Sequence, residues 1–446
     1  MAEAICSIST PFGLGAISII KASGDNVIFL ANKLFKGKDL TKAESHTINY
    51  GHIVYNGEVI DEVLVSVFKP PKTYTKEETV EINCHGGIFV TKKVLSIMLQ
   101  NGFRLAEPGE FTKRAYLNGR IDLLQAESVM DVISSENDLM LKEANHGLRK
   151  DLSDMIINFR NEIVQVLASI EVNIDYPEYE DIEVMTNEII LPPLLKMEKE
   201  IDKIIKLSNI GQVLKDGIDT AIIGKPNVGK SSILNMLLDE DKAIVSEFAG
   251  TTRDIVEGRL NLGDIILNLV DTAGIHESDD FIEKIGIQKT KEFLDKANLV
   301  LLVIDNSNVD EVDYSLLELT KNKNRIVILN KEDLNKEPKI KDYDLLLSTK
   351  DNHKIAEIKE IIMQKTNVSM LKDDNVLYLN NIRQISTLES ASKAIKDAIK
   401  ACHNLIPVDM IEIDIKKAWD LLGEVVGISS SSELIDTLFS KFCLGK

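Results

Sequence analysis

Two different spacings of apolar residues divide this chain into regions. Short apolar runs, typical of strands, dominate the first 118 residues and recur between residues 216 and 371. A 3.6-residue period, typical of amphipathic helices, dominates residues 121–217 and returns after residue 376. The pattern therefore predicts α/β regions that alternate with helical ones.

The first α/β region is expected to form a domain of its own. Its strands are predicted at residues 16–20, 53–55, 63–68 and 80–83, and a helix is predicted at 88–99. His85 lies between the last strand and two glycines. A histidine in such a turn is either catalytic or, more commonly, structural, and the sequence leaves both interpretations open.

The helical regions are predicted to form one domain from two segments. Ile156, Phe159 and Ile163 begin a stripe that predicts a long helix with its apolar face in a bundle. Pro192-Pro193 is expected to open the next helix, since proline fits the first helical turn. Residues 376–405 and 411–442 are helical again. The predicted domain ranges are 1–118 (α/β), 119–215 (helical, first part), 216–371 (inserted α/β) and 372–446 (helical, second part).

Composition limits the class of protein. The apolar fraction of 44% and charged fraction of 28% over 446 residues are typical of a soluble protein with two or three domains. We find neither a membrane-spanning apolar run nor a secretory signal, and the four cysteines lack metal-ligand spacing. We therefore expect a cytoplasmic protein that does not enter a membrane. The net charge of −19 argues against one broad nucleic-acid-binding surface.

A glycine-rich motif follows the apolar run 218–223 and precedes a helical pattern; its residues are Gly224, Lys225, Pro226, Asn227, Val228, Gly229, Lys230 and Ser231. This is the context of a phosphate-binding P-loop. The glycines let backbone N–H groups approach an anion, Lys230 can contact the β- and γ-phosphates, and Ser231 can ligate Mg²⁺. The alternative is a glycine-rich turn with a lone lysine.

Three further motifs argue against that alternative. Asp271-Thr272-Ala273-Gly274 ends an apolar strand, where an aspartate can hold Mg²⁺ through water. Asn330-Lys331-Glu332-Asp333 follows the strand 325–329, and the Asp333 carboxylate can accept both N1–H and N2–H₂ of guanine. Adenine would leave that charge unpaired, so discrimination is large. Ser348-Thr349-Lys350 follows 344–347, where backbone can close over the base. These motifs predict a Ras-like, P-loop GTP hydrolase domain.

The loop between the first two motifs is predicted to be a switch. It contains Ala249-Gly250-Thr251-Thr252-Arg253-Asp254, and a threonine there can complete the coordination of Mg²⁺. Ile275 occupies the position where many GTPases carry a water-orienting glutamine. The attacking water must therefore be oriented by another group.

Several runs outside the shared GTPase motifs are specific to one family. They are Ser9-Thr10-Pro11, Tyr74-Thr75, Cys84-His85-Gly86-Gly87, Pro108-Gly109-Glu110-Phe111, Asn118-Gly119-Arg120-Ile121-Asp122-Leu123 and Phe442-Cys443-Leu444-Gly445-Lys446, and Gly250-Thr251-Thr252-Arg253-Asp254 adds to them. On these residues the chain resembles, from end to end, the MnmE (TrmE) family of tRNA modification GTPases.

The resemblance implies an N-terminal domain similar to tetrahydrofolate-binding proteins, through which two chains form a homodimer. It implies a flavoprotein partner, MnmG, in a heterotetramer or larger complex. Together the two proteins would install an aminomethyl or carboxymethylaminomethyl group on C5 of the tRNA wobble uridine. A tetrahydrofolate derivative, 5-formyl or 5,10-methylene, would be the one-carbon source.

The resemblance also implies site residues. Potassium would be held by Asn227, Ser246, Phe248 and Thr251, magnesium by Ser231 and Thr252, and Glu283 would orient the attacking water. From the residues alone, Glu283 is more simply a solvated charge and Asn227 a turn residue. The GTP-binding set comprises Asn227, Val228, Gly229, Lys230, Ser231, Ser232, Ser246, Glu247, Phe248, Ala249, Gly250, Thr251, Thr252, Asp271, Thr272, Ala273, Gly274, Asn330, Lys331, Asp333, Ser348, Thr349 and Lys350.

The folate positions that match the family are Lys21, Glu81, Arg120 and Lys446. The family usually has arginine where this chain has Lys21, and commonly lysine where it has Arg120. Lysine keeps the charge but cannot reproduce a bidentate arginine contact. Cys443 either faces the folate or is a buried, inert thiol.

Two other functions compete with a potassium-stimulated GTPase in tRNA modification. One is a GTP switch that docks on RNA, as Era-like GTPases do; the acidic, helical segment 376–446 argues against it because such proteins carry a basic RNA-binding domain. The other is a one-carbon transferase that the GTPase only regulates.

Overall fold

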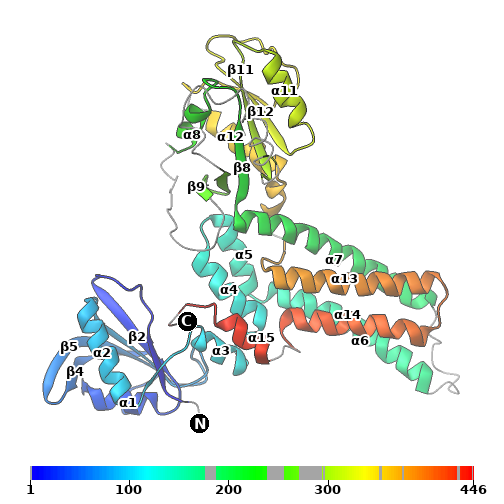
Figure 1. Cartoon of the computed structure of the whole chain (residues 1–446). Helices are drawn as coiled ribbons and strands as arrows, with labels where there is room; N and C mark the ends of the chain where they lie inside the picture. Colours follow the sequence, from blue (N-terminus) through cyan, green and yellow to red (C-terminus); the bar gives the residue numbers. More distant parts are fainter. Residues whose placement is uncertain are drawn as a thin grey trace. The chain divides into compact units, whose positions relative to one another are not determined.

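The computed structural model describes residues 3–175, 187–238, 256–270, 294, 297–350, 354–373, 376–428, 432–443 and 445 (Figure 1). The chain divides into two compact units. Unit 1 contains residues 1–130, 148–157 and 423–446, and unit 2 contains residues 131–147 and 158–422. Over the described residues, no helix combines the length and the apolar character needed to span a membrane. The four predicted domain ranges remain a prediction.

A seven-stranded sheet forms the N-terminal part of unit 1, in the order β3-β4-β5-β6-β2-β1-β7. All neighbours are antiparallel except β1 and β7. Helices α1 (Val27–Leu34) and α2 (Ile88–Gln100) pack against it around one apolar core. The strands are β1 (Ile5–Ile8), β2 (Ile17–Ser23), β3 (Phe35–Gly37), β4 (Thr47–Tyr55), β5 (Glu58–Phe68), β6 (Thr79–His85) and β7 (Arg104–Leu105).

Alternation along these strands explains which face is buried. Val63, Val65 and Val67 of β5 are buried, whereas Leu64 between them is exposed. Successive side chains of a strand point to opposite faces, so one face lies on the helices and the other is open. The four strands predicted from the sequence are present but longer, and β1, β3 and β7 were not predicted. These three strands have only four, three and two residues, which is too short to show the alternation that predicts a strand.

The rest of unit 1 is helical. α3 (Glu110–Leu117) and α15 (Ser432–Phe439) pack together through a small core in which Phe439 and Phe442 contact Ala115 and Ile121. Helix α4 (Leu123–Ser134) begins in unit 1 and ends in unit 2. Gly427 has a φ of 84°, and a Cβ there would lie 2.5 Å from the Leu123 side chain. Only glycine fits this turn.

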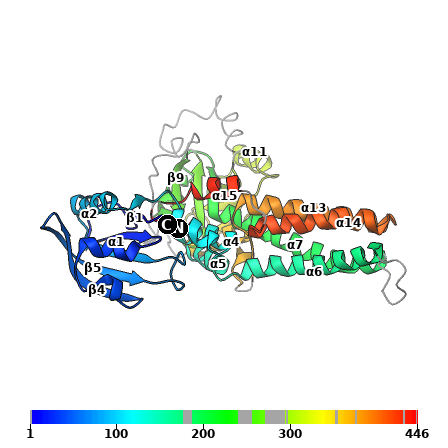
Figure 2. The ribbon, with the colours of Figure 1, turned by 90° about the horizontal axis from the view of Figure 1, so that it is seen from below.

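Long helices form the bundle of unit 2, side by side in both views of the ribbon (Figures 1 and 2). They are α6 (Asp151–Asp175, from residue 158 onward), α7 (Asn187–Asp216), α13 (Ile382–His403) and α14 (Val408–Val426, as far as residue 422). Asp202 of α7 accepts hydrogen bonds from Ser392 and Lys396 of α13. Four residues of the predicted stripe, Ile156, Phe159, Ile163 and Ile170, are buried, as expected for a helix face in a packed core, and Val166 is half-buried.

Two predicted helix starts are wrong. α7 begins at Asn187 and contains Pro192 and Pro193, which were expected to open it. Pro192 and Pro193 each lack the N–H that would donate to the carbonyl four residues earlier, and burial of Ile190 and Leu194 offsets this loss. α13 begins at Ile382 rather than at residue 376, because the Asn381 side chain accepts the Arg383 N–H and caps the helix there.

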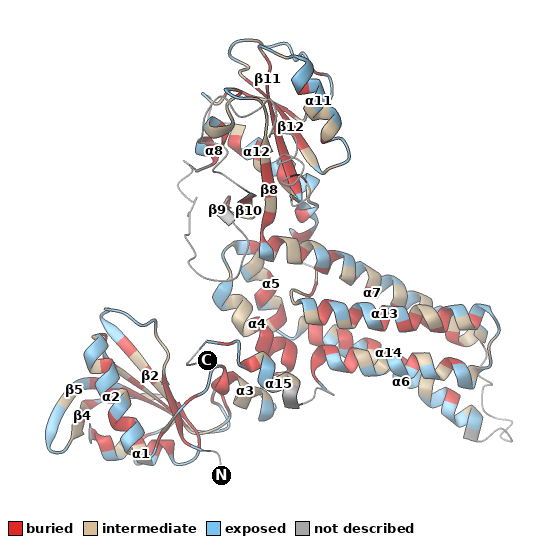
Figure 3. Cartoon of the chain, viewed as in Figure 1, coloured by how far each residue is buried: buried red, intermediate tan, exposed pale blue. Residues whose placement is uncertain are grey.

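A six-stranded sheet in unit 2 has the order β13-β12-β11-β8-β10-β9, parallel except for β9. Alternate residues of β11 enter different cores: Leu301 and Val303 pack with α8 (Lys230–Leu238) and α12 (Ile355–Lys365), whereas Leu302 and Ile304 pack with α11 (Glu311–Leu319). The strands are β8 (Ile218–Ile223), β9 (Val256–Asn261), β10 (Ile266–Val270), β11 (Leu299–Asp305), β12 (Arg325–Asn330) and β13 (Leu345–Leu346). The sheet is buried on both faces (Figure 3), and this layered arrangement is the α/β fold that the motifs predict.

Candidate functional site: a nucleotide loop and an N-terminal cavity

The glycine-rich loop lies between β8 and α8, as the sequence predicts. Gly224 has a φ of 156°, and a Cβ there would lie 2.2 Å from the Val303 carbonyl oxygen. Gly229 has a φ of 100°, and a Cβ there would lie 2.1 Å from the Asn330 side-chain nitrogen. Only glycine fits either position, so the loop lies tightly against β11 and the Asn330 motif.

Lys230 is held inside this loop. Its Nζ donates to the carbonyl oxygens of Gly224 at 2.9 Å and Lys225 at 2.7 Å. Burial lowers the pKa of this ammonium below its usual value. Ser231 is half-buried and Ser232 exposed in the same first turn of α8. A helix N-terminus with a lysine beside it forms an anion site, which suits the phosphates of a nucleotide.

Asn330 joins the base-recognition motif to the glycine-rich loop. Its side chain is buried, and its Nδ2 donates to the Val228 carbonyl oxygen at 2.8 Å. Lys331 follows with a φ of 67°, and its Nζ lies 2.6 Å from Asp305 at the end of β11. Residues that are 102 positions apart in sequence therefore form one site, although Asp305 was not predicted to belong to it.

Asp333 carries an oriented carboxylate. Ser348 Oγ donates to its Oδ1 at 2.9 Å, and Lys350 Nζ lies 2.5 Å from its Oδ2. The hydrogen bond from Lys350, followed by that from Ser348, lowers the pKa of Asp333. The predicted residues Asp333, Ser348, Thr349 and Lys350 are therefore neighbours. An ionised, fixed carboxylate can accept two N–H groups from the edge of a guanine base.

The other predicted nucleotide and metal residues lie outside the described residues. They are Ser246, Glu247, Phe248, Ala249, Gly250, Thr251, Thr252, Asp271, Thr272, Ala273, Gly274 and Glu283. Their roles stay predictions. The described half of the site contains the loop, Lys230, Asn330 and the Asp333 cluster.

A separate cavity of about 420 Å³ lies on the open face of the N-terminal sheet. Lys21, Glu81 and Arg120, three of the predicted folate residues, line it. Strand register places Lys21 directly opposite Glu81 on β2 and β6. The fourth predicted residue, Lys446, lies outside the described residues. The structure therefore brings the three described residues together.

Tyr74 is a cavity residue that was predicted only as part of a family motif and not as a folate-binding residue. Its ring centroid lies 4.3 Å from Lys21 Nζ and 4.8 Å from Arg120 Cζ, and its hydroxyl hydrogen-bonds Thr112 at 2.9 Å. Burial raises the pKa of this phenol, so it stays neutral. Two cations within about 6 Å of one aromatic ring form cation–π contacts. Nothing in the spacing of Lys21, Tyr74 and Arg120 could reveal this arrangement.

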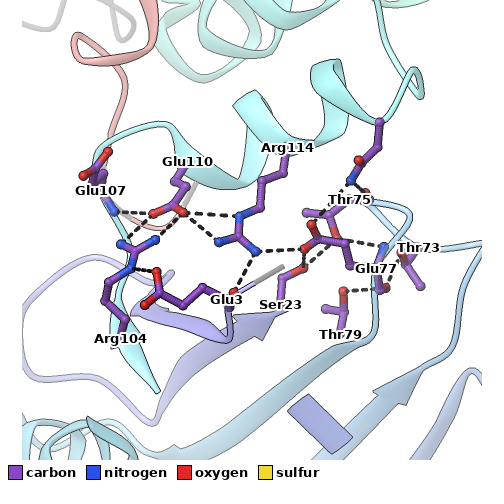
Figure 4. Close-up of polar contacts among 11 residues, drawn as sticks. Glu3, Ser23, Thr73, Thr75, Glu77, Thr79, Arg104, Glu107, Glu110 and Arg114 are labelled. Atoms are coloured by element: carbon purple, nitrogen blue, oxygen red, sulfur yellow. Dashed lines mark hydrogen bonds and ion pairs between the residues drawn. The ribbon is translucent and has the colours of Figure 1, made fainter. Parts of the chain in front are cut away.

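A buried ionic network holds the cavity segment 73–79 on α3 (Figure 4). Arg114 donates to Glu110 at 2.8 Å and to Glu77 at 3.2 Å, and all three side chains are nearly buried. Arg104 forms a second pair with Glu110 at 2.6 Å. Burial opposes the charge of Glu110, but hydrogen bonds from Arg104, the Glu107 N–H and Arg114 outweigh it, and the pKa of Glu110 is lowered.

Further hydrogen bonds connect this network to the cavity. Ser23 Oγ contacts Thr75 Oγ1 at 2.6 Å and donates to Glu77 at 2.8 Å (Figure 4). Asn118 Nδ2 donates to the Thr75 carbonyl at 2.6 Å, and Lys76 Nζ donates to the carbonyls of Asn118 and Gly119. These bonds fix Tyr74, which lies in the segment, relative to Arg120, which follows α3.

Two residues left open by the sequence are now clearer. His85 Nδ1 lies 2.7 Å from Asp61 Oδ1, the His85 N–H donates to Asp61 Oδ2 at 2.8 Å, and the Asp61 hydrogen bond raises the pKa of His85. The backbone contact favours a structural role. The Cys443 thiol is exposed, so the interpretation as a buried thiol is wrong.

Comparison with known proteins covers the whole chain. A family model described as the MnmE helical domain matches residues 123–443, and a second, described as the GTP-binding protein TrmE N-terminus, matches residues 4–120. The tRNA modification GTPase MnmE of Lactococcus lactis subsp. lactis (strain IL1403) is 49% identical over 448 residues, covering 100% of this chain and 98% of its own length. MnmE of Streptococcus pneumoniae (strain Hungary19A-6) is 46% identical over 452 residues, covering 100% and 99%.

A solved structure of the G domain of the T. maritima FeoB iron transporter matches 33% of this chain and 98% of its own length at 26% identity. Its TM-score of 0.24 is too low to bear on the fold. The relatives and the two family models confirm the resemblance inferred from the motifs. The chain belongs to the MnmE family of tRNA modification GTPases.

Proposed function

We propose that this chain is a potassium-stimulated GTPase that acts on tRNA together with the flavoprotein MnmG. The GTPase part of the proposal is carried by the hydrogen bond from Asn330 to Val228, which joins the guanine-reading motif to the phosphate loop. The potassium, tRNA and MnmG parts rest on the likeness to the family. One nucleotide can then contact the loop through its phosphates and Asp333 through its base. Residues of both motifs are needed to bind and orient GTP for hydrolysis.

The described residues have defined parts in this proposal. Loop N–H groups and Lys230 bind the phosphates, and the half-buried Ser231 hydroxyl is placed to ligate magnesium. Asn227 has a φ of 61° at the outer turn of the loop, and its amide oxygen suits a potassium ion. Bound cations would neutralise charge that develops on the phosphates. Thr252, Ser246, Phe248 and Thr251 would complete the two metal sites, and Glu283 would orient the water.

Replacement of Asp333 by asparagine tests the guanine assignment. An amide presents a donor as well as an acceptor, so it cannot accept both guanine N–H groups. We expect the affinity for GTP to fall by roughly 10²-fold or more and the preference over xanthosine triphosphate to reverse. Binding of fluorescent nucleotides gives both values. GTP affinity and base preference equal to those of the wild type would refute the assignment.

For the N-terminal cavity we propose a tetrahydrofolate derivative, 5-formyl or 5,10-methylene, as the ligand. The donor set fits, because Glu81 can accept N–H groups of a pteridine ring while Lys21 and Arg120 can pair with glutamate carboxylates. The bound folate would supply the one-carbon unit for the wobble uridine of tRNA.

Titration calorimetry with 5-formyltetrahydrofolate on the intact chain tests this. We expect measurable binding that Arg120→Ala weakens by roughly tenfold, the effect of one charge-assisted hydrogen bond. Arg149→Ala is the matched control, because Arg149 is an exposed arginine of the same unit that does not line the cavity. No binding by the wild type would exclude the folate assignment.

We propose that the chain forms a homodimer through the open face of the N-terminal sheet. Tyr50 pairs with Leu64 across β4 and β5, and Leu64 pairs with Asn83 of β6, in the row next to Glu81. Ile48, Tyr50, Leu64 and Ile17 are exposed by 67%, 61%, 44% and 62%. An apolar patch of this kind beside a cavity is typical of an interface.

Sedimentation velocity on the wild type and on Tyr50→Glu tests the dimer. A charge placed in an apolar interface would be desolvated, so we expect the variant to be monomeric at concentrations where the wild type is dimeric. Lys93→Glu, exposed on α2 at the other face of the sheet, is the control for added negative charge. A monomeric wild type would contradict the proposal.

A further inference from the structure

Lys225, the variable second residue of the glycine-rich loop, points at a helix. Its Nζ lies 2.8 Å from Asp310 Oδ2 and 2.7 Å from Asp313 Oδ2, and it donates to the Asn308 carbonyl at 3.2 Å. The lysine side chain is 14% exposed. The Lys225 ammonium therefore binds the N-terminus of α11, whereas the Lys230 ammonium in the same loop binds loop carbonyl oxygens.

The two carboxylates are themselves fixed. Asp310 is the N-cap of α11, where its Oδ1 accepts the Val312 N–H, and Asp313 Oδ2 accepts the Asp310 N–H. Together they form a capping box. Asp313 is fully buried, and no described residue hydrogen-bonds its Oδ1. Two neighbouring carboxylates repel each other, and one of them is buried, so a cation between them stabilises both.

The electrostatics of Lys225 agree with this geometry. Burial opposes its charge, but hydrogen bonds from its ammonium to Asp310 and Asp313 outweigh burial, and the pKa of Lys225 is raised. The positive end of the α11 dipole would by itself disfavour a cation at this place. The lysine is held there by the carboxylate pair.

The ion pairs of Lys225 with Asp310 and Asp313 form an anchor for the loop, and the backbone of Lys225 connects this anchor to the phosphate site. Its carbonyl oxygen accepts from Lys230 Nζ at 2.7 Å, and the neighbouring Gly224 carbonyl accepts at 2.9 Å. Gly224 in turn lies against the Val303 carbonyl of β11. Two carbonyl groups orient the Lys230 ammonium, and one of them is that of Lys225. Because the Lys225 side chain is bound to α11, this carbonyl group is held in place.

We propose that Lys225 is a positioning residue for GTP turnover, which acts through the carbonyl groups that orient Lys230. This inference rests on the nucleotide site proposed above. Loss of the anchor frees the first residues of the loop, and the ammonium then spends less time where the phosphates need it. Conformational restriction of this kind contributes to catalysis through orientation.

The test separates positioning from stability. Lys225→Met alone leaves Asp313 charged, buried and unpaired, so it destabilises the fold. The double variant Lys225→Met/Asp313→Asn removes the ammonium and the buried carboxylate together. The amide oxygen introduced at position 313 can still accept the Asp310 N–H. We expect wild-type thermal stability in the double variant but kcat/KM for GTP lower by roughly tenfold, as for one misplaced charge-assisted hydrogen bond. Lys225→Arg, which can pair with both carboxylates, should restore turnover to within about twofold.

Lys365→Met is the matched control, because Lys365 forms an ion pair of 2.8 Å with Asp344 in the same unit but does not contact the loop. Its kcat/KM should equal that of the wild type. A stable double variant with wild-type kcat/KM would overturn the proposal. So would a Lys225→Arg variant that folds normally but is as slow as the double variant.

Asp310→Asn keeps the proposal testable if the double variant does not fold. Asp310 is 49% exposed and asparagine is a good N-cap, so α11 should remain intact. We expect kcat/KM to fall by about two- to threefold, since one of the two carboxylates no longer attracts Lys225. An unchanged kcat/KM would contradict the inference. If the wild type itself fails to bind GTP, the proposed nucleotide site fails instead.

Discussion

The nucleotide loop and the N-terminal cavity position their charged side chains in different ways. In the loop, glycines let the backbone approach closely, and Lys230 is held by two carbonyl oxygens. At the cavity, ion pairs between side chains do this: Arg114 pairs with Glu77 and Glu110 and so fixes the segment that carries Tyr74. A site built on backbone geometry depends on glycine at fixed spacing, whereas a site built on paired charges depends on residues scattered through the sequence.

The largest expected effect comes from Gly229→Ala in the nucleotide loop. A Cβ there would lie 2.1 Å from Asn330 Nδ2, and the φ of 100° disfavours alanine. We expect GTP affinity to fall by roughly 10³-fold, because the loop must shift away from Asn330. Equilibrium nucleotide binding checks this. Gly57→Ala, also at positive φ but with open space around it, controls for backbone strain alone. Wild-type affinity in Gly229→Ala would show that loop and motif are not tightly joined.

Arg114→Met breaks the charge network of the cavity. The change leaves Glu77 and Glu110 nearly buried without this partner, so we expect a loss of about 3 kcal/mol in the free energy of unfolding. Folate binding should weaken while GTP turnover stays unchanged, since the hydrogen bonds of Arg114 go to Glu3, Glu77 and Glu110. Urea unfolding and turnover measure both. Lys196→Met, which breaks an exposed ion pair, is the control. A loss below about 1 kcal/mol would place this network among ordinary surface pairs.

Glu283→Ala tests the residue predicted to orient the attacking water. We expect the rate of GTP hydrolysis to fall by roughly 10²-fold while nucleotide affinity is retained, since orientation matters only for the chemical step. Single-turnover kinetics separate the two. Hydrolysis at the wild-type rate would show that Glu283 does not orient the water and is only a solvated charge.

Acid stability gives the smallest effect. The pKa of Glu110 is lower in the folded chain than its usual value of 4.5, so its contribution is present above that value and is lost as the pH falls through the folded-state pKa. We expect the free energy of unfolding to fall less between pH 7 and pH 3 in Glu110→Gln than in the wild type, because the variant has no carboxylate to protonate at this position. Unfolding at several pH values measures this, with exposed Glu58→Gln as the control. Parallel pH profiles for the wild type and Glu110→Gln would contradict it.

The sequence predicted the nucleotide site better than it predicted the cavity. Gly224, Gly229, Lys230 and Asn330 stand in motifs whose spacing reflects backbone geometry, and β8 begins and ends where the apolar run does. The anchor of Lys225 was missed because the motif leaves its position variable. The D-x-x-D spacing of Asp310 and Asp313 could have predicted the capping box of α11. It could not have predicted that Lys225 binds these two carboxylates.

The cavity was found through likeness to a family rather than through a pattern. Lys21, Glu81 and Arg120 come from two strands and the segment after α3, and only strand register and the Arg114 network bring them together. The position of Tyr74 between two cations depends on the same contacts. Such long-range pairings have no local periodicity, so one sequence could not reveal them.

We propose that this GTPase uses a potassium ion held by Asn227. The most direct test measures GTP turnover of the wild type and of Asn227→Ala in potassium chloride and in sodium chloride at matched ionic strength. We expect turnover of the wild type to be at least about tenfold faster in potassium, because the ion offsets charge that develops on the phosphates, and this stimulation to be lost in the variant. Equal, slow turnover of the wild type in both salts would contradict a potassium-assisted hydrolysis of GTP.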